Sequence, residues 1–421
     1  MIEMKKYKLG EIAEIQTGPF GSQLHNEDYV QDGTPIVTVE HLGSKEFSTQ
    51  NLPLVSNEDK HRLHKYILKE NDIVFSRVGS VDRCSFVSKK EDGWLFSGRC
   101  LRVRPKSIVN AEYLYYLLCT DSMKSFIRNK AVGATMPSLN TELLSNLPVT
   151  LLPFPVQQKI ASVLSSLDKK IALNKQINQN LEALARQLYD YWFVQFDFPN
   201  EEGKPYKSSG GKMIYNPILK REIPEGWEVK KLGEVENKII TGKTPSTSDP
   251  ENFGGDIPFI TIDDIRKAPY IYTSERTLTD KGANTQRGKF LPAGSLCCSC
   301  IGTPGVIGFV GIEAQTNQQI NTIVFDNVYN REFVYYALHW HFSTSTAKMG
   351  NILPNMSKEE FSQIQMVYPS EDIVKLYHSK VNHIFEEIDN RVQQIISLTK
   401  QRDELLPLLM NGQVNFDLSD D

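Results

Sequence analysis

The chain has 421 residues, of which 40% are hydrophobic and 23% are charged. This composition is typical of a globular protein with two or three domains and excludes disordered and fibrous classes. The net charge of −4 argues against a protein that coats DNA non-specifically, so DNA binding would need local basic surfaces. No apolar run approaches the ~18 residues of a membrane helix, and the N-terminus lacks the apolar segment of a secretory signal. We therefore expect a cytoplasmic protein that is not bound to a membrane.

Five sequence blocks in the first part of the chain recur about 220 residues later, in the same order. The run LGEIAEIQTG from Leu9 returns as LGEVENKIITG from Leu232, and TPIVTV from Thr34 returns as IPFITI from Ile257. The other three pairs are residues 72–87 and 295–310, 113–118 and 333–338, and 133–137 and 350–354. Because the five blocks recur in the same order with offsets that differ by only a few residues, the chain is a tandem duplication. We call residues 1–153 the first repeat and residues 227–370 the second repeat.

Each repeat mixes short β-rich runs with one aromatic, helical stretch. In the first repeat the β-rich runs are residues 35–39, 73–78 and 99–104. The helical stretches are residues 111–128 and 331–347. We therefore predict an α+β fold for each repeat.

A long helix with coiled-coil periodicity follows each repeat, within residues 154–196 and 371–421. Its hydrophobic residues follow alternating steps of four and three, which is typical of a packed helical seam. The predicted seam residues are Ile160, Leu164, Leu167, Ile171, Leu181, Leu188, Val381, Phe385, Ile388, Val392, Ile395, Leu406 and Leu409. Asn174 and Asn178 also stand in the seam, where they either fix the helix register or mark a frayed, solvent-facing stretch. Pro407 is expected to end or kink the second helix near Leu406.

Residues 197–226 are rich in Gly, Pro, Ser and charge, which predicts a linker. Such a linker would let the chain return, so that the two helices lie antiparallel. The predicted fold class is therefore α+β, with two tandem duplicated α/β domains and two long helices packed as an antiparallel coiled coil with pseudo-two-fold symmetry. Dimeric readers of duplex DNA use the same symmetry to place two heads on two half-sites. The segment 371–421 has ten acidic and five basic side chains, which favours a protein partner there.

Motifs for catalysis and metal binding are missing from the sequence. An adenine methyltransferase would need an Asp/Asn-Pro-Pro-aromatic tetrapeptide, whereas Asn216-Pro217 has only its first half. Residues 242–244 (GKT) resemble the end of a phosphate-binding loop, but Asn237 stands where that loop needs a glycine. The six cysteines show no CxxC spacing, and the cysteines of residues 297–300 are predicted to lie in a buried strand. We therefore expect no catalytic residue, no metal and no cofactor in this chain.

Several segments resemble the specificity subunits of type I restriction–modification systems. The runs LEALARQLYDYWFVQF from Leu181, REIPEGWEVKKLG from Arg221 and LLPLLMNGQV from Leu405 resemble their conserved regions. The runs TGPFGS from Thr17 and TGKTPS from Thr241 resemble the openings of their target-recognition domains. The resemblance spans the whole chain and includes the order of its parts. Arg402 departs from it, because it is a charged residue in the second helical seam.

The resemblance implies a non-catalytic DNA-binding subunit of a phage-defence complex. Each repeat would be a target-recognition domain that reads one half of a bipartite, asymmetric site in double-stranded DNA, and the helices would set the spacer. Two adenine-N6 methyltransferase subunits would dock on the helices, and restriction and translocase subunits would join them. S-adenosylmethionine and ATP would bind in those partner subunits. The alternatives are a stand-alone coiled-coil DNA-binding regulator or scaffold, and an enzyme in its own right.

Polar, basic and glycine residues in predicted loops are the candidates for DNA contact. In the first repeat they are Thr17, Gly18, Gly21, Ser22, Arg77, Gly79, Ser80, Arg102 and Arg104. In the second repeat they are Thr241, Gly242, Lys243, Thr244, Arg266, Lys267, Ser299, Gly302, Thr303, Asn317, Gln318 and Gln319. Arg102 and Arg104 alternate along a predicted strand, so their side chains should face the same way. The alternative for each residue is an ordinary turn or a solvated side chain.

Overall fold

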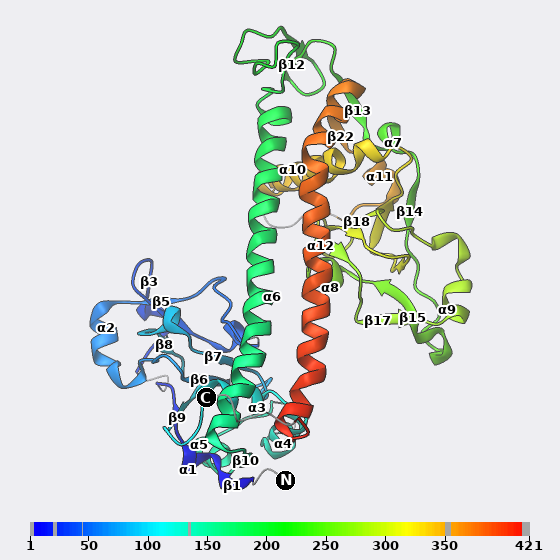
Figure 1. Ribbon diagram of the computed structural model, residues 1–421. Helices are drawn as coiled ribbons and strands as arrows, with labels where there is room; N and C mark the ends of the chain where they lie inside the picture. The colour runs from blue at the N-terminus through cyan, green and yellow to red at the C-terminus, as the bar shows by residue number, and fades with distance from the viewer. Residues whose placement is uncertain (1–3, 20–22, 44, 134–135, 350–354, 415–421) are drawn as a thin grey trace. The chain divides into compact units, whose positions relative to one another are not determined.

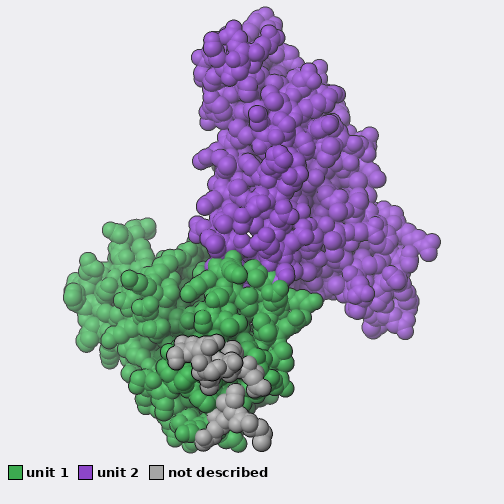
Figure 2. Space-filling view, in the orientation of Figure 1, with its two compact units in different colours: residues 1–170, 398–421 green, residues 171–397 purple. Residues whose placement is uncertain are grey.

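The computed structural model describes residues 4–19, 23–43, 45–133, 136–349 and 355–414. The chain divides into two compact units, which are residues 1–170 with 398–421 (unit 1) and residues 171–397 (unit 2), as Figure 2 shows. Each unit holds one repeat and parts of the two long helices, α6 (Phe154–Tyr189) and α12 (Glu371–Met410), which Figure 1 labels. No helix in the described part of the chain is long and apolar enough to cross a membrane.

The first repeat contains two four-stranded sheets and one strand pair. The strand orders are β2-β9-β6-β7, β3-β5-β4-β8 and β1-β10. Strands β4 and β8 run parallel, and the other pairs are antiparallel. The bounds are β1 Lys5–Lys8, β2 Ala13–Thr17, β3 Tyr29–Val30, β4 Thr34–Val37, β5 Leu54–Val55, β6 Ile73–Ser76, β7 Cys84–Phe86, β8 Leu95–Phe96, β9 Cys100–Pro105 and β10 Pro148–Leu151. Strands β4, β6 and β9 confirm the three predicted β-rich runs.

The helices of the first repeat are short. Their bounds are α1 Leu9–Ile12, α2 Asn57–Arg62, α3 Ala111–Leu118, α4 Asp121–Lys130 and α5 Thr141–Ser145. The predicted single helix over residues 111–128 is therefore two helices. The chain breaks at Thr120, which has an extended backbone and donates its hydroxyl to the carbonyl of Leu117 at 2.8 Å.

The second repeat has a five-stranded sheet, β14-β21-β18-β19-β16, a three-stranded sheet, β17-β15-β20, and the pair β13-β22. The strand bounds are β13 Glu228–Lys231, β14 Ile239–Thr241, β15 Phe253–Ile260, β16 Tyr270–Ile271, β17 Arg276–Leu278, β18 Leu296–Ser299, β19 Ile307–Val310, β20 Gln315–Thr316, β21 Ile320–Ile323 and β22 Gln365–Tyr368. The helix bounds are α7 Leu232–Val235, α8 Ile262–Ile265, α9 Asp280–Asn284, α10 Arg331–Met349 and α11 Lys358–Ser362. All four residues of β18 are buried, which confirms the buried strand predicted for the cysteine cluster.

Aromatic side chains from α6, α10 and α12 form the centre of unit 2. The ring of Phe193, just beyond the end of α6, lies 5.0 Å from Phe333 and 4.9 Å from Tyr377, in edge-to-face geometry. Tyr189 contacts the same two rings. Such pairs add roughly 0.5–1.5 kcal/mol each beyond the area they bury. The second repeat is therefore packed directly on the long helices of its own unit.

Within unit 2 the long helices run antiparallel. The Asn174 side chain contacts Arg391 and Gln394, whereas Asn178, one turn further along α6, donates to the carbonyl of Ile388 at 3.4 Å. Both asparagines are buried, so the alternative of a solvent-facing stretch is wrong. Within unit 1, Ile160 and Leu164 share a hydrophobic core with the last turn of α12.

The predicted seam residues differ in burial. Eight are buried, namely Ile160, Leu164, Ile171, Val381, Phe385, Ile388, Val392 and Leu409. The remaining five are half-buried, namely Leu167, Leu181, Leu188, Ile395 and Leu406. Pro407 does not end α12, which continues to Met410. Its carbonyl accepts a hydrogen bond from the Asn411 amide at 3.0 Å, so the helical pattern persists past the proline.

Residues 197–226, predicted as a linker, have a fixed structure within unit 2. Strands β11 (Met213–Asn216) and β12 (Arg221–Pro224) form a hairpin. Phe198 stacks on Tyr206 and Trp227 with ring centroids 4.6 and 4.7 Å apart. The burial of these rings explains why a segment of linker-like composition has a fixed structure.

Candidate nucleic-acid interface

Three loops of the first repeat meet at a cleft of about 560 Å³. They follow β4, β6 and β8, and contribute Thr38 and Glu40, then Arg77, then residues 97–99. The sheets bring these loops together because β4 pairs with β8, and β6 pairs with β9 directly after β8. Arg77 is the member of this cleft that the sequence singled out.

The second repeat has a corresponding cleft of about 430 Å³. It is lined by Thr261 and Asp263 after β15, by residues 302–303 after β18, and by Asn317 and Gln319 after β20. Arg266 also lines it. Five residues predicted from separate parts of the sequence are therefore neighbours here, namely Arg266, Gly302, Thr303, Asn317 and Gln319.

Backbone hydrogen bonds show that the two clefts are equivalent. The amide of Arg77 donates to the carbonyl of Arg99 at 2.8 Å, and the amide of Cys300 donates to the carbonyl of Gln319 at 2.8 Å. The Thr38 amide donates to His41 Nδ1, and the Thr261 amide donates to Asp264 at the same loop position, both at 3.0 Å. The duplication has thus kept the backbone while the side chains changed.

Glycines let the chain pass close to both clefts. A Cβ on Gly18 would lie 2.1 Å from the carbonyl oxygen of Ser97, and one on Gly242 would lie 2.1 Å from that of Asn317. Both glycines are therefore required by close packing. Gly79 and Gly302 have φ of +74° and +84°, and the space beside Gly79 is open, as expected for a turn that a phosphate could approach.

Arg102 and Arg104 face the same way, as predicted, because both reach the carbonyl of Ile67. Arg102 is 2% exposed and is paired with Glu14 at 2.7 Å. Arg104 donates two hydrogen bonds of 2.7 Å to Asp72, which is also buried. The expectation that Arg102 contacts DNA does not fit its burial, since its charge is already compensated inside the domain. Arg104 is likewise paired with a carboxylate inside the domain, so it stabilises the fold of the first repeat.

Other predicted residues of the first repeat lie near the cleft. The Arg77 guanidinium donates to Thr17 Oγ1 at 3.3 Å and to the Gly98 carbonyl at 3.2 Å. Ser80 is exposed beside Gly79. Gly21 and Ser22 lie outside the described residues.

Most of the predicted polar residues of the second repeat are held by neighbours. Thr241 donates its hydroxyl to Asn321 at 2.7 Å, and Thr244 donates to Gln318 at 2.6 Å. The buried Ser299 hydroxyl donates to the carbonyl of Thr303. Lys243 is exposed.

The predicted basic pair Arg266-Lys267 carries two local ion pairs. Arg266 is 3.1 Å from Asp263, and Lys267 is 3.1 Å from Asp264. Hydrogen bonds from Thr261 and Lys267 keep the pKa of Asp264 below its usual value, although burial acts to raise it. The rim of this cleft is therefore less positive than its sequence indicates.

Arg99 is absent from the residues predicted to contact DNA, although its counterpart Gln319 is among them. The offset that relates residues 113–118 to 333–338 leads from Gln319 to Arg99, and the equivalent hydrogen bonds that the two carbonyls accept show that this offset applies at the cleft. Arg99 is exposed at the cleft. An exposed arginine on a rigid loop is the side chain expected of a base reader.

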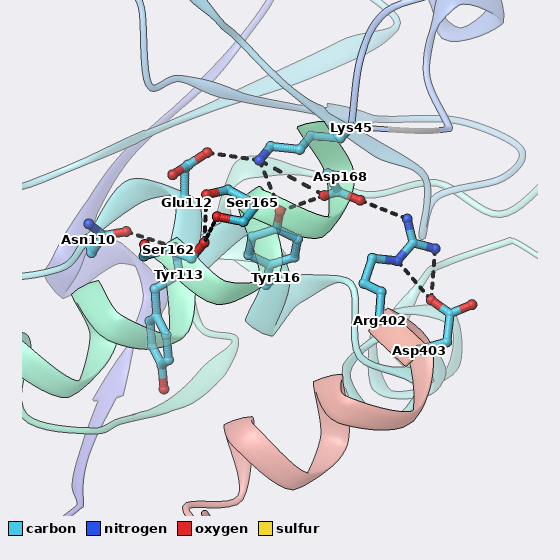
Figure 3. A network of polar contacts seen from close by, with 11 residues as sticks. Lys45, Asn110, Glu112, Tyr113, Tyr116, Ser162, Ser165, Asp168, Arg402 and Asp403 are labelled. Carbon is cyan, nitrogen blue, oxygen red and sulfur yellow. Dashed lines mark hydrogen bonds and ion pairs between the residues drawn. The ribbon is translucent and has the colours of Figure 1, made fainter. Parts of the chain in front are cut away.

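A polar network in unit 1 joins the first repeat to both long helices (Figure 3). Tyr116 of α3 donates its hydroxyl to Asp168 of α6 at 2.5 Å, and Arg402 of α12 donates to the other oxygen of Asp168 at 2.9 Å. Lys45 donates to Glu112 and to the Tyr116 oxygen at 2.8 and 2.9 Å. The contact with Asp168 thus explains why Arg402, a charged residue, stands in the seam of α12.

The chemistry that these clefts offer is recognition. The side chains that line the clefts carry guanidinium, amide, hydroxyl and carboxylate groups. Groups of these kinds form hydrogen bonds with base edges and phosphates. In the described part of the chain, no group of three or more His, Cys, Asp or Glu side chains is arranged to hold a metal ion.

The duplicated fold carries two matching clefts lined by polar side chains, and the chain belongs to the family described as type I restriction modification DNA specificity domain. The family profile matches residues 1–183 and 224–405. The chain is 29% identical to the type I restriction enzyme HindI specificity subunit of Haemophilus influenzae, over 98% of this chain and 100% of that protein. It is 30% identical to the MjaIX specificity subunit of Methanocaldococcus jannaschii, over 74% of this chain and 70% of that one.

A solved structure shares this fold. The crystal structure of the type I restriction–modification S subunit from M. genitalium superposes with a TM-score of 0.56 and 16% sequence identity. The match covers 97% of this chain and 96% of that one. The predicted α+β fold of tandem repeats with two long helices is therefore confirmed.

Proposed function

We propose that this chain reads a bipartite, asymmetric site in double-stranded DNA, with residues 1–153 and 227–370 as its two target-recognition domains. The observation that carries this proposal is the pair of equivalent clefts, which have one backbone and different side chains. Equivalent scaffolds explain why a site would have two similar halves, and different side chains explain why the halves would differ in sequence.

The chain itself would not be catalytic. It would direct adenine-N6 methylation by two methyltransferase subunits, and restriction by further subunits that translocate DNA. S-adenosylmethionine and ATP would bind in those partners, and the methyltransferase would turn its target adenine out of the duplex. The family membership and the recognition chemistry of the clefts support this division of work.

The test is a genome-wide map of N6-methyladenine in cells that express this chain with its methyltransferase subunit, compared with cells that lack it. A new motif with two short halves and a fixed gap is expected. Exchanging residues 1–150 for those of another family member should change one half only. No new methylation, with the methyltransferase active beside another specificity subunit, would instead favour a stand-alone DNA-binding regulator.

A further inference from the structure

The loops after β8 and β20 hold different side chains on one backbone frame. Residues 97–99 read Ser-Gly-Arg, and residues 317–319 read Asn-Gln-Gln. The Ser97 amide donates to the Val37 carbonyl at 2.8 Å, and the Asn317 amide donates to the Ile260 carbonyl at 3.3 Å. Each loop is thus held at its first residue by its amide. Each is held at its last residue by the carbonyl of Arg99 or Gln319, which accepts a main-chain hydrogen bond. The last residue of each loop is therefore placed alike in the two clefts.

The Arg99 side chain is available to a ligand. It is exposed, and no ion pair or side-chain hydrogen bond to another described residue engages its guanidinium. Arg77, in the same cleft, is instead tied to Thr17 and Gly98. Arg99 is therefore the arginine of this cleft that can reach a base edge without giving up an internal contact.

Gln319 is held differently. Its side-chain oxygen accepts a hydrogen bond from Asn317 Nδ2 at 3.1 Å, and its Nε2 lies beside Gly302, where an added Cβ would be 3.6 Å away. The carbonyl oxygen retains a second lone pair, and the amide nitrogen is a donor. The Asn317 bond fixes the plane in which these two groups are presented.

Arginine and glutamine pair with different bases. Arginine donates twice to O6 and N7 of guanine, and glutamine pairs with N6 and N7 of adenine, both in the major groove. We propose that Arg99 reads a guanine in the half-site of the first repeat, and that Gln319 reads an adenine in the half-site of the second repeat. This assignment rests on the proposed function, and it identifies one base contact in each half.

The test uses the full chain with its methyltransferase subunit, and the methylated motif is read by single-molecule sequencing. Arg99→Gln should remove the requirement for one guanine in the half-site that changes when residues 1–150 are exchanged, and leave the other half unchanged. Gln319→Arg should alter one adenine position in the other half only. The matched controls are Arg128→Gln, on the exposed face of α4, and Gln363→Arg, at the end of α11, which should keep the wild-type motif.

A binding measurement covers variants that methylate too weakly to give a motif. The purified complex is titrated with the wild-type duplex and with duplexes carrying each other base at the assigned guanine. For the wild type the preference for guanine should be about 5- to 150-fold. Arg99→Gln should abolish that preference, and Arg99→Lys should weaken it, because lysine keeps the charge but not the bidentate fork.

Two results would overturn the assignment of Arg99. One is an Arg99→Gln motif that still specifies the same guanine. The other is an equal loss of affinity for all duplexes with the preference intact, as a phosphate contact would give. An adenine requirement that survives in the Gln319→Arg variant would overturn the assignment of Gln319. A wild-type complex that methylates no new motif would reject the proposed function, which is a different failure.

Discussion

Arg402 of α12 donates a hydrogen bond to Asp168 of α6 at 2.9 Å, at a seam position where the duplicated helix has Leu181. Asp168 also accepts the hydroxyl of Tyr116, so one carboxylate serves a helix–helix contact and a contact to the first repeat. Its side chain is 13% exposed and that of Arg402 is 29% exposed. The pair is therefore partly shielded from water, and its loss should be measurable.

We expect Asp168→Ala to destabilise unit 1 by about 2 kcal/mol, less than the loss of one partner of a fully buried pair. Arg402→Leu should cost less, because Tyr116 and Lys45 still compensate Asp168. The double variant should lose less than the sum of the two, with a coupling of roughly 1 kcal/mol. Calorimetric unfolding of the four proteins measures this coupling, and strictly additive effects would show that the pair is not coupled.

Arg104→Gln should destabilise the first repeat without changing the target. Asp72 is buried and would be left with an uncompensated charge, at a cost of about 2–3 kcal/mol. The methylated motif, mapped at a temperature where the variant is folded, should be that of the wild type. Arg99→Gln is the matched contrast, since it should change the motif with a stability change within about 0.5 kcal/mol. If Arg104→Gln changes the methylated motif, Arg104 must be counted again among the residues that contact DNA.

The two seam asparagines should respond in opposite directions to replacement by leucine. Asn174 accepts a hydrogen bond from Arg391 at 3.0 Å, so Asn174→Leu should lower the stability of unit 2 by about 1–2 kcal/mol. The buried side-chain oxygen of Asn178 has no hydrogen-bond partner among the described residues, so Asn178→Leu should raise stability by about 1 kcal/mol. Thermal unfolding of the two variants decides this, and a loss of stability in both would contradict it.

Acid should destabilise unit 2 through His339. Burial lowers the pKa of this imidazole from 6.5 to about 4, with a further contribution from Arg186. The native state thus keeps the ring neutral while the unfolded chain binds a proton, so stability present above pH 6.5 is lost as the pH falls toward 4. A shift of this size corresponds to about 3 kcal/mol.

His339→Phe should reduce the loss of stability with falling pH, because phenylalanine keeps the contact with Tyr335 and cannot bind a proton. Part of the dependence of stability on pH, which is the slope to be measured, should remain, because burial also lowers the pKa of His341. Denaturant unfolding between pH 7 and pH 4 measures the slope, with His383→Gln, at an exposed site, as the control. An unchanged slope in His339→Phe would assign the acid sensitivity to other groups.

Patterns along the chain predict the repeats and the helical seam because they depend on local spacing. The step of four and three identifies Ile160 and Leu164 as buried without knowledge of their partners. The alternation of Arg102 and Arg104 likewise predicts that they face the same way. Their partners Glu14 and Asp72 lie 88 and 32 residues away, so their role as scaffold needs the fold.

The candidate site could be predicted only in part, for the same reason. Glycine and polar residues identify loops, but the distinction between Gly18, which packs against Ser97, and Gly79, which faces open space, depends on contacts between distant segments. The order of residues 197–226 also depends on packing, because Trp227 must reach Phe198. Composition alone predicts a linker there.

The main-chain hydrogen bonds that hold the two cleft loops form a frame that bears on how the sequence of this chain can evolve. Its hydrogen bonds use main-chain carbonyls, which every amino acid provides, so residues 99 and 319 can vary without weakening the frame. Substitutions of an exposed residue such as Arg99 usually alter stability by less than about 0.5 kcal/mol, which keeps the chain above the threshold for folding. If these two residues read bases as proposed, a lineage carrying this chain could acquire a new DNA target through single codon changes, in one proposed half-site at a time, with its proposed partner enzymes unaltered.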